Sequence, residues 1–364
     1  MLSCSCTRAW SIACLSLLLS SLAWSQQSAA DKLIAEGHYN RARPLVQAAL
    51  EKRPQDVDAL IALSTIQWSY GQLDAATATA ERALLAAEGS AAAHAQLLNT
   101  LGAKLASRKV SSFEKFGLAR RFRQEADRTL QLDPNSLYAH EALARFYWYA
   151  PAIAGGGKTK ARQSLDRLVQ LDAARGYALK AELDATESNS AAVQADWQRA
   201  VAANPRSYTA KIGLASSFLA AGGERLRPAE AQAEIALALN PSRIASYRLL
   251  AAVYVATARW DSLDAILRRA RVAVPDDLGA EFTTAQSILD HNIGSQWTRA
   301  EQCLRNYLAQ PSEGLGPSMA MAHWRLGTVL EKEGRRGDAL RELETAVNLD
   351  PSLDEAKKDL KRLR

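Results

Sequence analysis

Small and apolar residues recur at helical spacings along this chain, and the pattern is most complete near the C-terminus. There the recurring residues run Leu326-Gly327-x2-Leu330-x3-Gly334-x4-Ala339-x3-Leu343-x2-Ala346-x4-Pro351. Spacings of three and four place side chains on one face of a helix, so the run predicts two helices joined by a turn at Gly334. The small residues mark the places where these two helices approach each other closely.

This pattern repeats with a period of about 34 residues, which is typical of a helix–turn–helix unit. Gly37 and Gly71 are one such period apart, and so are Ala42 and Ala76. One helix pair cannot bury its apolar face alone, whereas stacked pairs share a continuous core. The sequence therefore predicts an all-α stack of helix pairs with one continuous core.

Turn residues close the predicted helices. Gly37, Gly71 and Gly334 stand where first helices end, and glycine suits the left-handed conformation of a helix cap. Proline follows Asp or Asn at the ends of second helices, because proline cannot continue a helix. These pairs are Asp133-Pro134, Asn204-Pro205, Asn240-Pro241 and Asp350-Pro351.

Two segments depart from the regular period. Ser111 and Glu114 form a capping-box pattern, which predicts a long helix that ends at about Leu132. The charged segment 352–364 has apolar residues on one face, as a capping helix at the open end of a stack requires. These apolar residues are Leu353, Ala356, Leu360 and Leu363.

The repeating residues resemble the tetratricopeptide repeat, a helix–turn–helix unit, over roughly residues 31–351. The resemblance implies a right-handed superhelical solenoid of about eight or nine repeats within residues 26–351. The capping helix at 352–364 would follow it. It also implies a non-catalytic scaffold or adaptor that binds a protein or peptide and needs no cofactor.

In this family the first helices line a concave groove at fixed positions of each repeat. The matching positions here hold aromatic, acidic and basic side chains of the kind found in peptide hot spots. We expect the groove to be centred on the fourth repeat. The candidate groove residues are Asp58, Trp68, Tyr138, Glu141, Arg145, Trp148, Tyr149, Arg248, Met321 and Trp324. In the alternative interpretation, Trp68 and Trp148 fill the core between repeats.

Composition agrees with a helical chain, because Ala supplies 70 and Leu 50 of the 364 residues and both favour helices. The formal net charge of +6 is mild for a protein that binds nucleic acid. Lys and Arg nevertheless gather between Lys104 and Arg128, beside Phe113, Phe116 and Phe122. Such a stretch suits an acidic protein, a lipid headgroup or nucleic acid, or it is a solvated helix face.

Residues 1–25 have the pattern of a secretory signal peptide. Arg8 precedes an apolar run over residues 12–22, and Ala23 and Ser25 supply the small residues of a cleavage site. Cleavage near Ser25 predicts a mature chain without a membrane span, in the periplasm or outside the cell. Nucleic acid is therefore not an expected partner.

Residues 152–159 satisfy a relaxed phosphate-loop pattern, with Gly155-Gly156-Gly157-Lys158-Thr159 at its centre. A phosphate loop joins a strand to a helix, whereas the preceding segment 138–149 has the pattern of a first helix. The alternative is an insertion in the turn between two helices. The five histidines do not pair at the spacing of a helical zinc site, and Cys303 is the one cysteine beyond the signal segment. We therefore predict neither catalytic residues nor a metal site.

The tract from Phe146 to Lys158 also resembles a turn found in secreted bacterial tetratricopeptide proteins. These include proteins similar to the periplasmic T component associated with some TRAP-type transporters. This resemblance implies a second candidate function, an accessory component of solute transport that binds a small ligand or a transporter subunit. The first hypothesis is a periplasmic scaffold, and an envelope or transporter protein is one possible partner.

Overall fold

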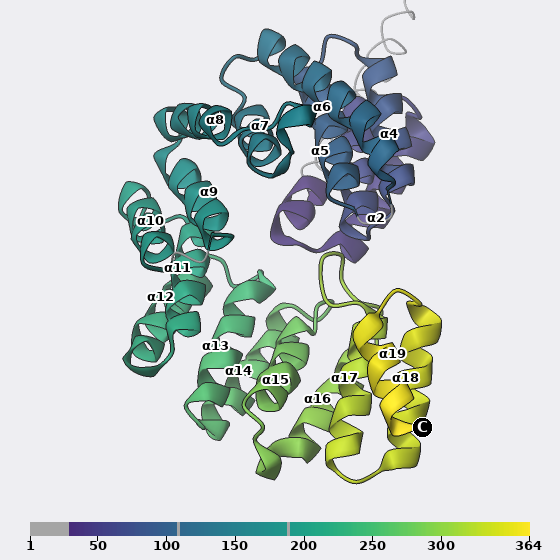
Figure 1. Cartoon of the computed structure of the whole chain (residues 1–364), viewed down its shortest axis with the longest axis vertical. Helices are drawn as coiled ribbons and strands as arrows, with labels where there is room; N and C mark the ends of the chain where they lie inside the picture. Colours follow the sequence, from purple (N-terminus) through teal and green to yellow (C-terminus); the bar gives the residue numbers. More distant parts are fainter. Residues whose placement is uncertain (1–28, 108–109, 188–189) are drawn as a thin grey trace, which may run out of the picture. The chain divides into compact units, whose positions relative to one another are not determined.

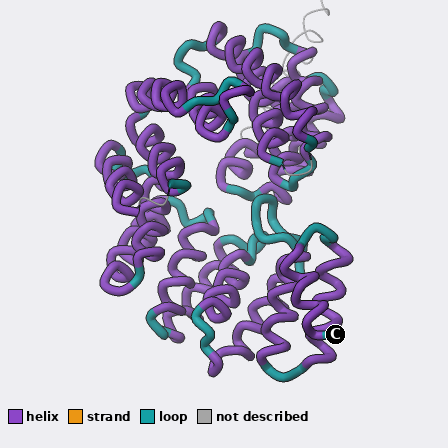
Figure 2. Tube along the Cα trace, viewed as in Figure 1, coloured by secondary structure: helices purple, strands orange, loops and turns teal. Residues whose placement is uncertain are grey.

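The computed structural model describes residues 29–107, 110–187 and 190–364. The predicted signal peptide, residues 1–25, therefore lies outside the described residues. Within the described ranges every regular element is a helix and no strand is present (Figure 2). This confirms the predicted all-α fold class.

A helix over residues 29–36 precedes α2. The α-helices that follow are mostly of similar length, with the longer α6 and the shorter α19 as exceptions. Three short 3-10 helices, η1 to η3, lie in turns between them. The α-helices are α2 (Tyr39–Lys52), α3 (Val57–Ser69), α4 (Leu73–Ala86), α5 (Ala91–Ala106), α6 (Ser112–Leu132), α7 (Leu137–Tyr149), α8 (Lys158–Leu171), α9 (Ala173–Ala185), α10 (Ser190–Ala203), α11 (Tyr208–Ala221), α12 (Leu226–Leu239), α13 (Ile244–Ala256), α14 (Trp260–Ala273), α15 (Gly279–Asp290), α16 (Trp297–Leu308), α17 (Met319–Lys332), α18 (Arg336–Leu349) and α19 (Asp354–Leu363). The 3-10 helices are η1 (Ala152–Ala154), η2 (Gly223–Arg225) and η3 (Gly294–Gln296).

The helices follow one another as antiparallel pairs, which the labels of Figure 1 allow the reader to trace. The odd-numbered helices from α3 to α17 are the first members of their pairs, and the even-numbered helices are the second members. Helices α3 and α4, α9 and α10, and α17 and α18 pack closely together, as do most of the other pairs. The described helices thus form eight complete pairs from α3 to α18, in agreement with the predicted number of repeats.

Gly37, Gly71 and Gly334 all adopt the left-handed conformation predicted for them, with φ of 96°, 69° and 78°. The N–H of the following residue then reaches back across the turn. In the last of these turns the N–H of Arg335 donates to the carbonyl of Leu330 at 2.9 Å. This bond satisfies a carbonyl that the end of the helix would otherwise leave without a partner.

Two other first helices end in the same turn without a glycine. Ala258 and Asn292 have φ of 53° and 50°, and they are the non-glycine residues with positive φ in the described chain. The N–H of Arg259 donates to the carbonyl of Tyr254 at 2.9 Å, which is the bond seen after Gly334. Asparagine tolerates this conformation, whereas the Cβ of an alanine is strained in it.

The long helix α6 begins and ends where the sequence predicts. The Ser111 side chain accepts a hydrogen bond from the N–H of Glu114, whose carboxylate accepts one from the N–H of Ser111 in return. This is the reciprocal capping box. At the other end, Asp133 caps the helix directly before Pro134.

Contacts divide the described chain into two compact units. The N-terminal unit contains the described residues up to Phe146, together with Pro151–Gly155. The C-terminal unit contains Tyr147–Ala150 and the described residues from Gly156 onward. The described buried residues include a large cluster in the C-terminal unit, which extends from Ala178 to Leu363, and smaller clusters in the N-terminal unit.

Small residues allow close approach between helices inside the C-terminal unit. Gly213 of α11 faces the indole ring of Trp197 on α10, and a Cβ at that position would lie 2.4 Å from three ring carbons. The side chain of Trp197 is itself buried. Its ring thus occupies the space that any side chain at position 213 would need.

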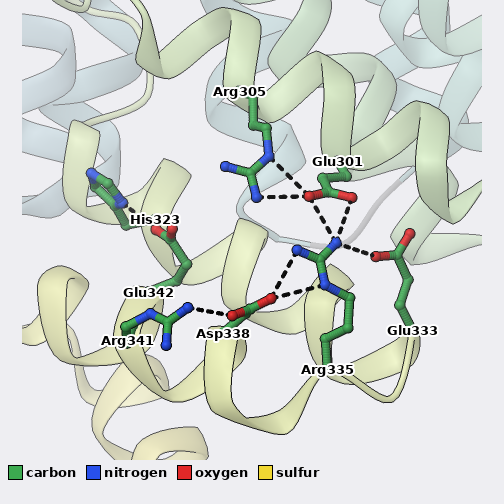
Figure 3. Close-up of polar contacts among 8 residues, drawn as sticks. All are labelled: Glu301, Arg305, His323, Glu333, Arg335, Asp338, Arg341 and Glu342. Carbon is green, nitrogen blue, oxygen red and sulfur yellow. Dashed lines mark hydrogen bonds and ion pairs between the residues drawn. The ribbon is translucent and has the colours of Figure 1, made fainter.

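Ion pairs connect successive helix pairs at separations close to one repeat. Glu301 of α16 accepts hydrogen bonds from Arg305 on its own helix and from Arg335, which lies one repeat further along. Arg335 also pairs with Asp338 of α18, as Figure 3 shows. His323 on α17 contacts Glu342 on α18 at 2.6 Å in the same view. This network joins α16 to the α17–α18 pair.

Helix α19 packs on α18 and follows the last complete pair. Its buried residues are Ala356, Leu360 and Leu363, and its other side is charged and exposed. None of the helices in the described part of the chain combines the length and the apolar character that crossing a membrane needs.

Candidate functional site

The first helices lie side by side within each unit. Helix α3 contacts α5 in the N-terminal unit, and α9, α11, α13, α15 and α17 contact one another in succession in the C-terminal unit. No comparable contact joins successive second helices among the described elements. The first helices are therefore closer together than the second helices, which places them on the inner side of the curve within each unit.

The ten candidate groove residues do not come together in one place. Asp58, Trp68, Tyr138, Glu141 and Arg145 lie in the N-terminal unit. The other five, which are Trp148, Tyr149, Arg248, Met321 and Trp324, lie in the C-terminal unit. The expected centre of the groove, on α7, falls at the boundary between the units, after Phe146.

In the N-terminal unit the candidate residues are partly available to solvent. Asp58 is exposed, and Trp68 and Tyr138 are half-buried. The guanidinium of Arg145 donates to the carboxylate of Glu141 one turn earlier, at 3.0 Å. These two side chains therefore have a local partner already.

Trp148 and Tyr149 differ sharply in exposure although they are adjacent. Trp148 is 9% exposed, whereas Tyr149 is 61% exposed. The indole N–H of Trp148 donates to the hydroxyl of Thr186 at 3.1 Å. The ammonium of Lys158 lies 3.2 Å from the centroid of the indole ring. In this position Trp148 packs between successive helix pairs, and Tyr149 is the more available of the two.

The glycine-rich turn uses its own polar groups internally. The N–H of Gly155 donates to the carbonyl of Ala152, and the N–H of Gly157 donates to the carbonyl of Tyr147, both at 2.9 Å. Lys158 pairs with Glu187 at 2.9 Å. A phosphate loop instead directs its N–H groups and its lysine at a phosphate. The arrangement is that of an inserted turn between α7 and α8.

Arg248 and Trp324 both bond to the next helix pair. The Nε of Arg248 on α13 donates to Thr283 on α15 at 3.1 Å. The indole N–H of Trp324 on α17 donates to Asp359 on α19 at 2.8 Å. Both bonds span about one repeat, so these polar groups hold neighbouring first helices together, while the rest of each side chain stays half-exposed.

Arg325 on α17 is a residue that the sequence analysis does not single out. Its guanidinium lies 3.9 Å from the centroid of the Trp324 ring, which is a cation–π contact. Its Nε is buried and has no hydrogen-bond partner. A buried donor without a partner costs free energy, and the guanidinium is held here by its contact with the ring.

The charges around Arg325 come from three helices. Burial lowers the pKa of the guanidinium, and the nearby carboxylates of Asp290 on α15 and of Asp359 and Glu355 on α19 oppose that effect. Together with Met321 and Trp324, these side chains form a mixed surface of one cation, three acids and two large apolar groups on the first-helix side. We call these six residues the α17 surface.

His94, His140 and His323 have structural partners, and Cys303 is buried. His94 contacts Glu125 at 2.7 Å and the carbonyl of Glu88 at 3.0 Å, and His140 contacts the carbonyl of Pro134. Burial raises the pKa of the Cys303 thiol well above its usual range, so it remains a neutral apolar group. Among the described residues, no group of three or more His, Cys, Asp or Glu side chains is arranged to hold a metal ion.

A pocket of about 480 Å³ opens between α4 and α6 in the N-terminal unit. Arg121 bridges it by pairing with Glu81 at 2.6 Å. It therefore carries both signs of charge beside exposed apolar groups. The lining residues are Glu81, Leu84, Leu85, Glu88, His94, Arg121 and Arg128.

Comparison with known proteins gives one family match. Residues 33–101 match the tetratricopeptide repeat family. A thermophilic tetratricopeptide repeat protein of Thermus thermophilus is similar in structure, with a TM-score of 0.47 and 20% identity, over 54% of this chain and 99% of that chain. Yeast Tom70 has a TM-score of 0.49 and 14% identity, over 94% of this chain and 88% of that chain. No curated protein matches the sequence.

Proposed function

Because this chain carries tetratricopeptide repeats, we propose that it is a non-catalytic scaffold that binds a protein segment on its first-helix side. The observation that carries the proposal is the α17 surface, where the half-buried Arg325 guanidinium lies 3.9 Å from the centroid of the half-buried Trp324 ring. A half-buried aromatic ring with an adjacent arginine is typical of the residues that dominate protein interfaces. The terminal nitrogens of this half-buried guanidinium would donate to a backbone oxygen of the partner.

The proposal is tested by selecting peptides from a displayed library against the chain and measuring their affinity for variants. Arg325→Gln combined with Met321→Ala should weaken binding roughly tenfold, since a hydrogen bond to a charged group is worth about 1.5 kcal/mol. Arg341→Gln is the matched control, because Arg341 is exposed on the second helix α18. Equal affinity of the selected peptides for all three proteins would refute the site.

The choice of variants follows from burial. Arg145 and Trp148 are poorer probes, because Trp148 is buried and Arg145 is paired with Glu141. Their replacement would disturb packing as well as binding. Saturable binding of a small organic acid, with no peptide selected, would instead favour an accessory role in solute transport.

We also propose that the mature chain works in the periplasm. The support is the charged, apolar and small-residue pattern over positions 1–25. Fractionation of cells that express the full chain should place it in the periplasmic fraction, with an N-terminus near Gln26. Recovery of the uncleaved chain from the cytoplasm would contradict this location.

A further inference from the structure

The first two turns of α6 extend beyond the packed core. Its first buried residue is Ala119, and the residues before it are exposed or half-buried. Phe113 is 89% exposed and Phe116 is 49% exposed. Two phenylalanines three positions apart lie on the same side of a helix, so both aromatic rings are exposed to solvent on one side of α6. Large aromatic side chains are seldom left so exposed without a reason.

Cationic and apolar groups continue along the same side of α6. Arg120 and Arg123 follow Phe116 at spacings of four and seven, whereas the buried Phe122 marks the opposite side. Helix η1 packs against α6 and contributes Ile153, which is 81% exposed. The Arg123 guanidinium lies beside Gly155, at the end of η1. We call Phe113, Phe116, Arg120, Arg123 and Ile153 the α6 patch.

The cations of the α6 patch differ from the other cations nearby. Lys104 pairs with Asp74 and Arg121 pairs with Glu81. In the described ranges no ion pair involves Arg120 or Arg123.

The acids of α6 leave this charge largely uncompensated. Glu114 keeps its charge in the capping box but, nine positions before Arg123, lies on the other side of the helix, and Glu125 contacts His94. Asp127 is the exposed acid that remains, one turn beyond Arg123. The patch is therefore cationic, with aromatic and aliphatic groups at its centre.

We propose that the α6 patch docks on the surface of an anionic phospholipid bilayer. Phenylalanine inserts at the boundary between headgroups and acyl chains, and Lys and Arg attract anionic headgroups. The aromatic rings stand on a projecting helix rather than in a hollow. A bilayer accepts such a projection without a complementary cavity, whereas a folded acidic protein would have to supply one. This proposal is independent of the first-helix site.

The test is cosedimentation of the chain that begins at Gln26, which contains every described residue, with lipid vesicles. The vesicles hold equal parts of phosphatidylglycerol and phosphatidylcholine, and vesicles of phosphatidylcholine alone serve for comparison. We expect binding to the anionic vesicles that weakens as salt is added. Arg120→Gln and Arg123→Gln together should weaken it about 25-fold, at roughly fivefold for each cation. Phe113→Ala with Phe116→Ala should weaken it about tenfold.

Two control variants match these changes elsewhere on the chain. Arg162→Gln with Arg206→Gln removes two exposed charges, and Val272→Ala with Leu315→Ala removes two exposed apolar groups. Both controls should bind anionic vesicles as the parent does. Failure of the parent to bind, or equal loss in the controls, would overturn the proposal. Binding of polyglutamate without binding of vesicles would also overturn it and assign the patch to an acidic protein.

Discussion

At the scale of single residues, the turns that end first helices place different side chains in one backbone conformation. Gly334 has φ of 78° in its turn, and Ala258 has φ of 53° in the equivalent turn after α13. Glycine adopts this region without steric cost, whereas alanine places its Cβ too near the following carbonyl oxygen. Ala258 is therefore a position where the fold tolerates strain.

Replacing Ala258 by glycine should stabilise the protein. Relief of the strain is worth about 1–2 kcal/mol, and the greater freedom of glycine in the unfolded chain offsets roughly half of it. We expect a net gain of about 0.5–1 kcal/mol in the free energy of unfolding, measured by urea denaturation.

The reverse exchange at Gly334 provides the control for this effect. Gly334→Ala places a Cβ in the same conformation and should cost about 1 kcal/mol. Nothing lies within 4 Å of that Cβ position, so a loss there would reflect the backbone alone. A loss of stability in Ala258→Gly would show that the turn after α13 is not strained.

The sequence predicts a residue's conformation where that conformation depends on the residue's own side chain. It does not predict the burial of a side chain where burial depends on residues from other helices. The left-handed glycines follow from their spacing, because the turn favours a residue without a Cβ. The burial of Trp148 depends on Thr186 and Lys158, and the position of Arg325 depends on α15 and α19. No spacing within one repeat carries that information.

At the scale of the helix, α6 combines a well-formed start with a first segment that lacks packing. Its capping box closes the N-terminus, yet burial begins only at Ala119. Helix stability in that segment therefore comes from local hydrogen bonds, with little help from a core.

Ser111→Ala should loosen the first turns of α6 without unfolding the protein. Loss of an N-cap costs about 1 kcal/mol, which corresponds to roughly fivefold faster amide hydrogen exchange over residues 112–118. The midpoint of thermal unfolding should stay unchanged, because these turns bury little surface.

Ser318→Ala is the matched cap removal on a packed helix. Ser318 accepts a hydrogen bond from the N–H of Met321, but α17 already buries Ala320 in its first turn. Its loss should lower the global stability by about 1 kcal/mol. Equal global losses in the two variants would mean that the start of α6 is part of a cooperative core.

Helix boundaries are the part of this fold that the sequence predicts best. Ser111, Asp133 and Pro134 end or begin helices through contacts with residues adjacent in the sequence. Their effect therefore does not depend on how the helix packs against its neighbours. The tetratricopeptide resemblance is confirmed by the family match over residues 33–101. Which turns of α6 meet a neighbour is a property of the packed structure, so the exposure of Phe113 does not follow from the pattern.

At the scale of the whole chain, contacts one repeat apart connect the helix pairs within a unit. The Glu301–Arg335 pair is one of them, and Arg335 extends it to Asp338. Each helix pair thus stabilises its neighbours, as expected of a stack with nearest-neighbour contacts.

Glu301→Gln should flatten the acid side of the stability profile. Burial raises the pKa of Glu301, but hydrogen bonds from Arg305 and Arg335 outweigh it, so the pKa lies below its usual 4.5. The folded state then binds fewer protons than the unfolded state in mild acid. The stabilisation is fully present above pH 4.5 and is lost as the pH falls through the lowered pKa. As the pH falls through this range, we expect the free energy of unfolding of the parent to decrease by roughly 1 kcal/mol. The decrease is no larger because both arginines are partly exposed, which weakens their interaction with Glu301.

The variant and the parent are to be compared by urea denaturation at several pH values below neutrality. The parent should be more stable at neutral pH, and the two curves should converge in acid. Parallel curves would mean that Glu301 has the same pKa in the folded and unfolded states.

The division into two units is the large-scale feature that the repeat pattern does not predict. The period continues through α7 and α8, and the sequence shows no composition change after Phe146. The insertion over residues 151–157 is visible in the sequence, but the division after Phe146 is defined by the contacts of the folded chain. A repeat pattern predicts the length of each helix pair. It does not predict how strongly one helix pair packs against the next.

The contact between Gly213 and Trp197 has a consequence for the history of the sequence. A methyl group at position 213 collides with the indole ring, whereas a smaller side chain at position 197 merely leaves space. Evolution can therefore replace Trp197 first and Gly213 second. In the opposite order, the intermediate protein has a side chain at position 213 that clashes with Trp197. In an alignment of relatives, a side chain at position 213 should accompany the loss of the tryptophan, and the reconstructed ancestors should show the tryptophan lost first.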